Sequence, residues 1–274
     1  MRRLDRAGKI SGVLGVLGSV IILMGLSGCF GGGGGRTSGG MIPKESRLSA
    51  HLKMGLAFLE VGDYNSALAE FSKADLLEPN NVDVNNYLGQ TFFRRGDFPK
   101  AIERFQKVLT LDASRTEAHN NLGLVYLRQK DFVQARQEFE ICVKDPTYNQ
   151  THLAQFNLGL LEESEGHLAE AEAIYHKVIN SNQMILAYYR IGQLALNRRD
   201  YQKAVDYLTP AVRLDPRYVD AYYALAQAYE GVDKKDEAAE AYGQVVNLSP
   251  NTSRAIEAQS RVRRLLGFDD TPKR

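Results

Sequence analysis

Residues 121–139 read NLGLVYLRQKDFVQARQEF and contain the pattern that decides the fold. Gly123 follows Leu122, Ala135 comes twelve residues after Gly123, and Phe139 comes four residues after Ala135. Large apolar residues recur at the spacing of helix faces, and the small Gly123 and Ala135 allow two helices to approach closely. The stretch therefore predicts a pair of packed helices.

The same pattern recurs along the chain with a period of about 34 residues. In four more copies a glycine follows Met, Leu or Ile, at Gly55, Gly89, Gly159 and Gly192. The sixth copy has Leu225-Ala226 at this place. Alanine occupies the second small position at Ala67, Ala101, Ala171, Ala204 and Ala238. A large residue follows it at Phe71, Phe105, Tyr175, Leu208 and Tyr242. A fixed period of this length is the signature of a repeat protein.

These positions, with turns at Gly62-Asp63, Gly96-Asp97 and Asp200, resemble the tetratricopeptide repeat. The resemblance implies an all-α fold, a right-handed superhelical solenoid of six helix pairs with a concave face. The repeats are expected at residues 48–81, 82–115, 116–149, 152–184, 185–218 and 219–252. Residues 253–267 carry arginines among apolar residues and predict the capping helix that the end of a solenoid requires, and residues 268–274 form a tail.

The first 28 residues have the layout of a secretory signal peptide. Four basic side chains lie in residues 1–9, and residues 10–28 carry no charge. A permanent transmembrane helix is the rival interpretation, but the run is marginal in length and diluted with Gly and Ser.

Leu26-Ser27-Gly28-Cys29 resembles the bacterial lipobox, which implies that the Cys29 thiol carries diacylglycerol and that Cys29 begins the mature protein. Phe30 follows it, whereas lipoproteins kept in the inner membrane typically resemble one another in having Asp there. The resemblance thus favours the outer membrane, facing the periplasm. The glycine-rich residues 29–47 predict a tether.

Composition limits the kinds of partner. The 274-residue chain has a formal net charge of +1, and removal of residues 1–28, with four basic groups and one acidic group, leaves about −2. A near-neutral protein lacks the clustered basic charge that binds nucleic acid. We therefore expect no nucleic-acid partner.

We expect that this protein is not an enzyme and that it binds no cofactor, metal or small-molecule substrate. No GxSxG or phosphate-binding Gly-rich motif is present, and the five histidines lack metal-ligand spacing. The carboxylates of Glu162 and Glu163 are expected on solvated helix faces. Cys142, His51 and His119 fall at packing positions of the repeat and are interpreted as core residues.

The concave groove of this repeat family is lined by fixed positions of the first helix of each repeat. Carried onto this chain, they give Asn86, Gln90, Phe93, Arg94, Asn120, Leu124, Leu127, Arg128, Phe156, Leu160, Tyr189, Gln193, Leu196, Tyr223 and Gln227. This apolar, amide-rich surface suits an extended or amphipathic protein segment. The open alternative is that some of these residues pack between repeats. Receptors for acidic C-terminal tails carry Lys and Asn where this chain has Leu52 and Leu56, so that partner is not expected.

Two inserted residues after 144–150 (KDPTYNQ), together with Asn120-Asn121-Leu122-Gly123, resemble the type IV pilus biogenesis/stability lipoproteins, the PilF/PilW/Tgl pilotin group. The resemblance implies a pilotin that binds secretin subunits and promotes their outer-membrane localisation and multimer assembly. Two alternatives stay open. One is a general periplasmic scaffold that gathers envelope or peptidoglycan-processing proteins, and the other is the carrier of an unrecognised hydrolase activity.

Overall fold

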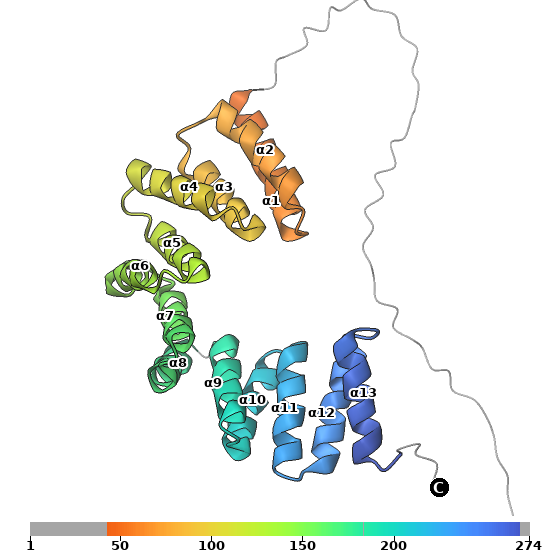
Figure 1. Cartoon of the computed structure of the whole chain (residues 1–274). Coiled ribbons are helices and arrows are strands. Elements are labelled where there is room, and N and C mark those ends of the chain that lie inside the picture. The colour runs from red at the N-terminus through yellow and green to blue at the C-terminus, as the bar shows by residue number, and fades with distance from the viewer. Residues whose placement is uncertain (1–42, 183, 269–274) are drawn as a thin grey trace, which may run out of the picture. The chain divides into compact units, whose positions relative to one another are not determined.

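The computed structural model describes residues 43–182 and 184–268, which form thirteen α-helices and no β-strand (Figure 1). The helices are α1 (Lys44–Glu60), α2 (Tyr64–Leu77), α3 (Val82–Arg95), α4 (Phe98–Leu111), α5 (Thr116–Gln129), α6 (Phe132–Lys144), α7 (Thr151–Glu165), α8 (Leu168–Asn182), α9 (Ile185–Asn197), α10 (Tyr201–Leu214), α11 (Val219–Gly231), α12 (Lys235–Leu248) and α13 (Ser253–Leu265). The all-helical fold class expected from the sequence is confirmed. The signal segment, Cys29 and most of the tether lie outside the described residues.

The helices pack as six hairpins that stack in chain order. Each odd-numbered helix from α1 to α11 pairs with the helix that follows it, and the second helix of each hairpin packs on the first helix of the next. First helices also contact each other from one hairpin to the next, as in α1 with α3 and α3 with α5. Below, helix A and helix B denote the first and second helix of a hairpin.

Glycine and a large side chain meet inside each of the first five hairpins. A Cβ placed at Gly123 would lie 2.5 Å from Phe139 Cε1, so only glycine lets the ring pack directly on the helix backbone. Gly55 and Gly89 face Phe71 and Phe105 in the same way. The spacing that predicts the hairpins is therefore the spacing of their closest contact.

The turn between helix A and helix B has a consistent design. Asp63, Asp131 and Asp200 each accept a hydrogen bond from the backbone N–H three residues further on, at Ser66, Gln134 and Lys203. Such N-caps satisfy a backbone donor that the helix itself cannot. Gly96 ends α3 at a φ of 84°, and Lys130 takes the equivalent place after α5 at a φ of 62°.

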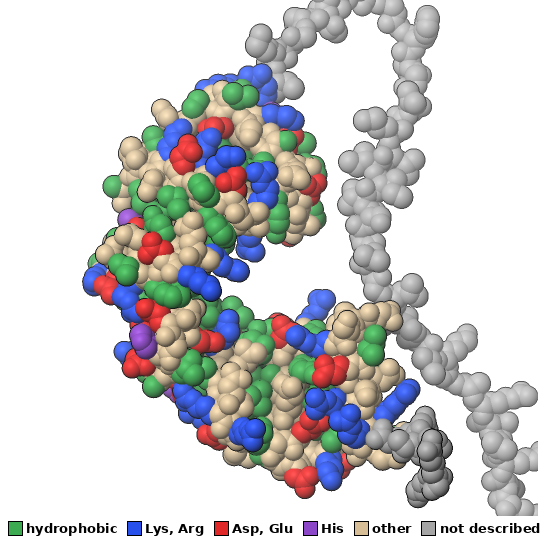
Figure 2. Space-filling model, viewed as in Figure 1, with side chains coloured by type: hydrophobic (Ala, Val, Ile, Leu, Met, Phe, Trp, Pro, Cys, Tyr) green, Lys and Arg blue, Asp and Glu red, His purple; other side chains and the backbone are tan. Residues whose placement is uncertain are grey.

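Ion pairs join successive hairpins to each other and the last hairpin to α13. Arg104 Nη1 lies 2.9 Å from Asp75 Oδ2, and Arg261 Nη1 lies 2.9 Å from Glu230 Oε2. Figure 2 shows acidic and basic side chains interspersed over the face in view, with hydrophobic side chains among them. The second of these pairs holds α13 against α11, while Ala258 of α13 joins the apolar cluster around Tyr242.

Cys142 is fully buried in α6, as its repeat position predicts. Burial raises the pKa of its thiol to about 12, so the thiolate is negligible at neutral pH. His51 and His119 are half-buried at equivalent places, where their Nδ1 atoms lie 2.7 and 2.6 Å from carboxylates of Glu70 and Glu138. No helix in the described part of the chain has both the length and the apolar character needed to cross a membrane.

The expectation that Glu162 lies on a solvated helix face is wrong. Its carboxylate is buried between α6 and α7, where the Arg136 guanidinium donates to Oε1 and His167 Nδ1 lies 3.0 Å from Oε2. Arg136 also donates to Glu165 Oε2 at 2.6 Å. The hydrogen bond from Arg136 is the largest cause that lowers the pKa of Glu162, and it outweighs the opposing effect of burial. Glu162 therefore links the third hairpin to the fourth as a charged group.

This pair gives the fold an acid-dependent contribution. Because folding lowers the pKa of Glu162, its contribution is present above the unfolded carboxyl's value of about 4.3 and is lost as the pH falls below it. We expect Glu162→Gln to lower the free energy of unfolding by about 1.5 kcal/mol at pH 7, since a charged hydrogen-bond acceptor is removed.

Urea denaturation at pH 7 and at pH 3.5 measures this effect, and the difference from wild type should narrow at the lower pH. Glu140→Gln is the matched control, because the Glu140 side chain is 44% exposed and, among the described residues, its carboxylate pairs only with the exposed Lys144. An effect of Glu162→Gln no larger than that of Glu140→Gln would contradict the assignment.

Candidate protein-binding groove

The A helices present one face along the stack. Because α1, α3 and α5 pack on one another in order, residues at equivalent positions follow each other from repeat to repeat. Large and polar side chains at the same positions in consecutive repeats therefore line a continuous surface. Two cavities lie on this face, one over the first three hairpins and one over the last two.

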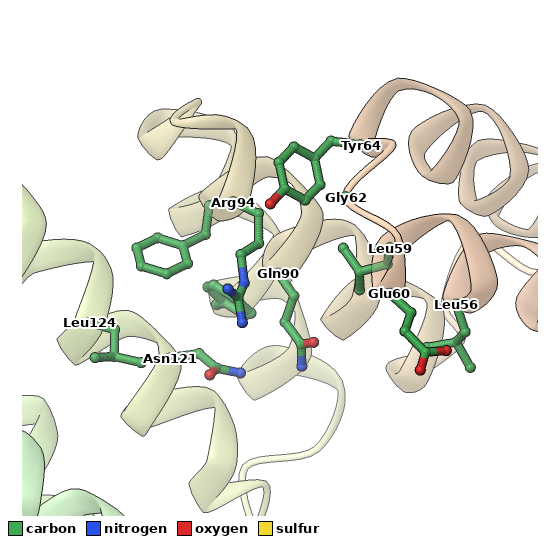
Figure 3. A pocket seen from close by; sticks show the side chains of 11 residues that line it. Leu56, Leu59, Glu60, Gly62, Tyr64, Gln90, Arg94, Asn121 and Leu124 are labelled. Carbon is green, nitrogen blue, oxygen red and sulfur yellow. The ribbon is translucent and has the colours of Figure 1, made fainter. Parts of the chain in front are cut away.

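The first cavity has a volume of about 640 Å³ (Figure 3). It is lined by Leu56, Leu59, Glu60, Gly62, Tyr64, Gln90, Phe93, Arg94, Phe105, Asn121 and Leu124. Figure 3 shows Leu59 and Tyr64 of the first hairpin on one side, Asn121 and Leu124 of the third on the other, and Arg94 and Gln90 between them. The lining thus combines apolar walls with amide and charged groups.

Amide groups form a chain across the helices beside this cavity. Asn121 Nδ2 donates to Asn86 Oδ1 at 3.2 Å, which joins α5 to α3. Asn86 Nδ2 and Gln90 Nε2 both lie 3.4 Å from Glu117 Oε1, at the long end of hydrogen-bond range. These amides keep free hydrogen-bonding capacity, which can pair with the backbone of an extended segment.

Two apolar side chains of the first cavity, Phe93 and Leu59, pack against other side chains of the repeats. Phe93 is half-buried, and its ring lies 6.2 Å from that of Phe98 at the start of α4. Leu59 is also half-buried and packs against the apolar cluster that α2 and α3 share. Both side chains therefore have fixed positions and one open face, as anchor points in protein interfaces do.

The second cavity has a volume of about 290 Å³. It is lined by Tyr189, Gln193, Leu196, Asn197, Asp220, Tyr223, Ala224, Gln227 and Arg254. Gln193 Nε2 donates to the Tyr189 hydroxyl at 2.6 Å, and the Arg254 guanidinium lies 5.3 Å from the centre of the Tyr223 ring. Arg254 also pairs with Asp220, so this cavity is more polar and its charges are satisfied.

Comparison with known proteins gives the family. Residues 48–81 and 189–252 match tetratricopeptide repeat families, and residues 89–130 match a TPR repeat family. This chain is a tetratricopeptide-repeat protein. No protein of curated function matches the sequence.

Solved structures share this tetratricopeptide fold. One is PilW, described as a widely conserved type IV pilus biogenesis factor, with a TM-score of 0.65, 18% identity and coverage of 77% of this chain and 98% of PilW. Another is pilF of Pseudomonas aeruginosa, with a TM-score of 0.63, 22% identity and coverage of 79% and 98%. Yeast Tom70 has a TM-score of 0.69 and 19% identity, and covers 81% of this chain but 47% of Tom70. At these identities the likeness shows the fold.

Most of the residues predicted for the tetratricopeptide groove lie on or beside the two cavities. Gln90, Phe93, Arg94 and Leu124 line the first, and the second is lined by Tyr189, Gln193, Leu196, Tyr223 and Gln227. Asn86 belongs to the amide chain beside the first cavity. Leu127 and Leu160 are half-buried and Arg128 is exposed, and none of the three lines either cavity.

Two predicted groove residues are largely buried inside the stack. Asn120 accepts a hydrogen bond from Asn157 Nδ2 at 2.9 Å inside the stack. Phe156 is 6% exposed, and its ring lies 5.4 Å from that of Tyr175. The alternative of packing between repeats therefore describes Asn120, while Phe156 packs within its own hairpin. Truncation of Phe156 would therefore disturb the packing of the core as well as the binding of any partner.

Sequence reasoning missed the contribution of the first repeat. Leu56, Leu59 and Glu60 occupy the same repeat positions as Gln90, Phe93 and Arg94, so the register that found the latter three could have found them. Asn121 was missed because it lies one residue beyond the expected groove position. Tyr64 comes from the start of helix B, for which the groove pattern has no position.

One cluster in the described part of the chain has the composition of a metal site. Glu162, Glu165 and His167 bring ligand atoms within 4.8 Å of one another. Arg136, however, donates to both carboxylates, and His167 contacts Glu162. The cluster is therefore explained as an ion-pair network between repeats.

Proposed function

We propose that this protein is an outer-membrane lipoprotein that acts as a pilotin, binding secretin subunits and promoting their localisation and multimer assembly for type IV pili. The observation that carries the proposal is the correspondence with PilW, a type IV pilus biogenesis factor. The similarity in fold extends over 98% of PilW and 77% of this chain. For pilF of Pseudomonas aeruginosa the shares are 98% of pilF and 79% of this chain.

The groove supports a protein client. Its first cavity combines Leu59, Phe93 and Leu124 with the amides of Gln90 and Asn121. Apolar anchors with amides around them suit an extended segment, because the anchors bury alternate side chains while the amides pair with its backbone. The client in this proposal is a segment of a secretin subunit.

The sequence supports attachment through lipid. Cys29 ends an uncharged apolar run and has the lipobox residues Leu26-Ser27-Gly28 before it. The glycine-rich stretch after it separates the anchor from the repeats. The lipid on Cys29 would thereby hold the groove and its client near the outer membrane, where the secretin multimer must assemble.

Deletion of the gene in the native host tests the proposal. A pilotin predicts loss of surface pili together with loss of detergent-resistant secretin multimers, both restored by a plasmid copy. Normal pili and normal multimers would overturn it. Altered cell shape with intact pili would favour the scaffold that gathers envelope or peptidoglycan-processing proteins.

Cys29→Ala is expected to abolish anchoring, because no other residue can accept the lipid. The variant protein should be uncleaved or mislocalised, and secretin multimers should disappear from the outer-membrane fraction. Membrane fractionation and mass spectrometry of the N-terminal peptide measure both effects. Cys142→Ala is the matched control, since Cys142 is a buried core residue in α6. Wild-type protein found entirely soluble, without lipid mass on Cys29, would contradict the anchor.

A further inference from the structure

The last turns of α1, α3 and α5 carry a row of three charges. Glu60, Arg94 and Arg128 occupy the same position of the first, second and third repeats, 34 residues apart. All three side chains are exposed, and Glu60 and Arg94 line the first cavity. The A helices of these repeats pack on one another, so the row runs along the groove in the order negative, positive, positive.

The two arginines of the row differ from the other arginines around them. The second and third repeats contain six arginines, and four form ion pairs within the structure: Arg95 with Asp97, Arg104 with Asp75, Arg115 with Asp83 and Asp112, and Arg136 with Glu162 and Glu165. Arg94 and Arg128 pair with no carboxylate among the described residues. The unpaired arginines of these repeats are thus the two on the groove face.

Glu60 stands out among the acidic residues of the first repeat in the same way. The four others have polar side-chain or ionic partners: Asp63 with Ser66, Glu70 with His51 and Lys73, Asp75 with Arg104, and Glu78 with Lys44 and Asn81. Glu60 has no such partner among the described residues. Glu117, a further carboxylate beside the groove, already lies within hydrogen-bond range of the amides of Asn86 and Gln90.

We propose that this charge row selects and orients the bound segment, which carries a basic residue opposite Glu60 and acidic residues opposite Arg94 and Arg128. The inference rests on the proposed function only in that the groove binds a protein segment. Complementary charges at an interface fix register and exclude wrong partners more than they add affinity. Because the row is asymmetric, it also sets the direction in which the segment lies.

Spacing gives the segment a definite pattern. Packed helices lie about 8–10 Å apart, which corresponds to about three residues of extended chain. The segment is therefore expected to carry Lys or Arg, then Asp or Glu about three residues away, then Asp or Glu about three residues further, with apolar residues between them. These apolar residues would contact Leu59, Phe93 and Leu124.

A designed peptide library tests the charge row without knowledge of the natural client. The probes are fluorescent 12-residue peptides with apolar residues between three variable positions, spaced by two to four residues. Each variable position carries Lys, Gln or Glu. A C-terminal amide removes the terminal carboxylate as a ligand. Binding to the full-length chain in mild detergent is measured by fluorescence anisotropy at low and at high salt.

For wild type we expect the Lys–Glu–Glu order to bind about tenfold more tightly than the Glu–Lys–Lys order at low salt, as three partly exposed ion pairs allow. The preference should shrink at 1 M salt, where exposed charges are screened. The triple variant Glu60→Lys, Arg94→Glu, Arg128→Glu should prefer the reversed order. Arg95→Gln is the matched control, because Arg95 adjoins Arg94 but pairs with Asp97, and it should leave the preference unchanged.

The outcomes separate this inference from the proposed function. Equal affinity for both charge orders, with binding still lost in Leu59→Ala/Phe93→Ala, would overturn the inference that the charge row selects the segment. The groove would still be the place where the segment binds. Absence of binding by any peptide would also overturn it, while gene deletion tests the pilotin role separately. A preference that follows the reversed charges of the triple variant supports it even if deletion leaves pili intact.

Discussion

Gly123→Leu is expected to lower the free energy of unfolding by about 3 kcal/mol, the upper part of the range for overpacked cores. A Cβ at this position would lie 2.5 Å from Cε1, 2.6 Å from Cδ1 and 2.9 Å from Cζ of Phe139. Phe139 is fully buried, so its ring has no free space to enter. The leucine must therefore push α5 and α6 apart.

Circular dichroism measures the effect as a fall in melting temperature of about 6 °C or more for a domain of this size. Gly243→Ala is the matched control, because Gly243 is a helical glycine of α12 with no atom within 4 Å of an added Cβ. Alanine there should raise stability by about 0.5–1 kcal/mol, since it restricts the unfolded chain. Equal melts for Gly123→Leu and wild type would show that this close contact is absent.

The helix pairs could be predicted from the sequence because the pattern that encodes them is repeated and local. Gly123 and Phe139 are only sixteen residues apart, and the same spacing returns at Gly55 with Phe71 and at Gly89 with Phe105. Each copy is weak evidence by itself, but agreement between copies fixes which helix face turns inward. The two helices of a hairpin follow from this face.

The burial of individual side chains could not be predicted in this way. Repeat position places a side chain on a helix face, but whether a neighbouring helix covers it depends on the residues of that neighbour. Phe156 and Tyr189 share a repeat position, yet Phe156 is buried against Tyr175 of its own hairpin and Tyr189 lines a cavity. Glu162 is buried because Arg136 of the preceding repeat neutralises it. Such pairing requires knowledge of two repeats at once.

The groove shows the same division between the predictable and the unpredictable. The register gave the positions of Gln90, Phe93 and Arg94, and it applies equally to Leu56, Leu59 and Glu60, which it was not used to find. Asn121 and Tyr64 could be found only from the folded chain, since they reach the cavity from outside the expected positions. No pattern in this chain specifies the sequence of the client segment. The sequence specifies only the charges of the groove that face the segment.

Leu59→Ala combined with Phe93→Ala is expected to abolish secretin multimer formation while the protein stays folded, lipidated and at normal abundance. Both side chains line the first cavity with one face open, and a central anchor of this kind loses about 2 kcal/mol or more of binding when truncated. Two such losses weaken binding about a thousandfold if they add. Phe156 is unsuitable for this test because it is buried in the core.

Immunoblots of detergent-resistant secretin multimers measure the effect in cells, and circular dichroism of the purified variant shows whether the repeats remain folded. The matched control is Leu76→Ala combined with Val133→Ala, which removes apolar side chains of similar size that are 84% and 68% exposed and line neither cavity. This control should assemble secretin as wild type does, because neither side chain reaches the groove. If the groove variant is folded and still assembles normal multimers, secretin uses another surface, and the A-helix face must serve a different client.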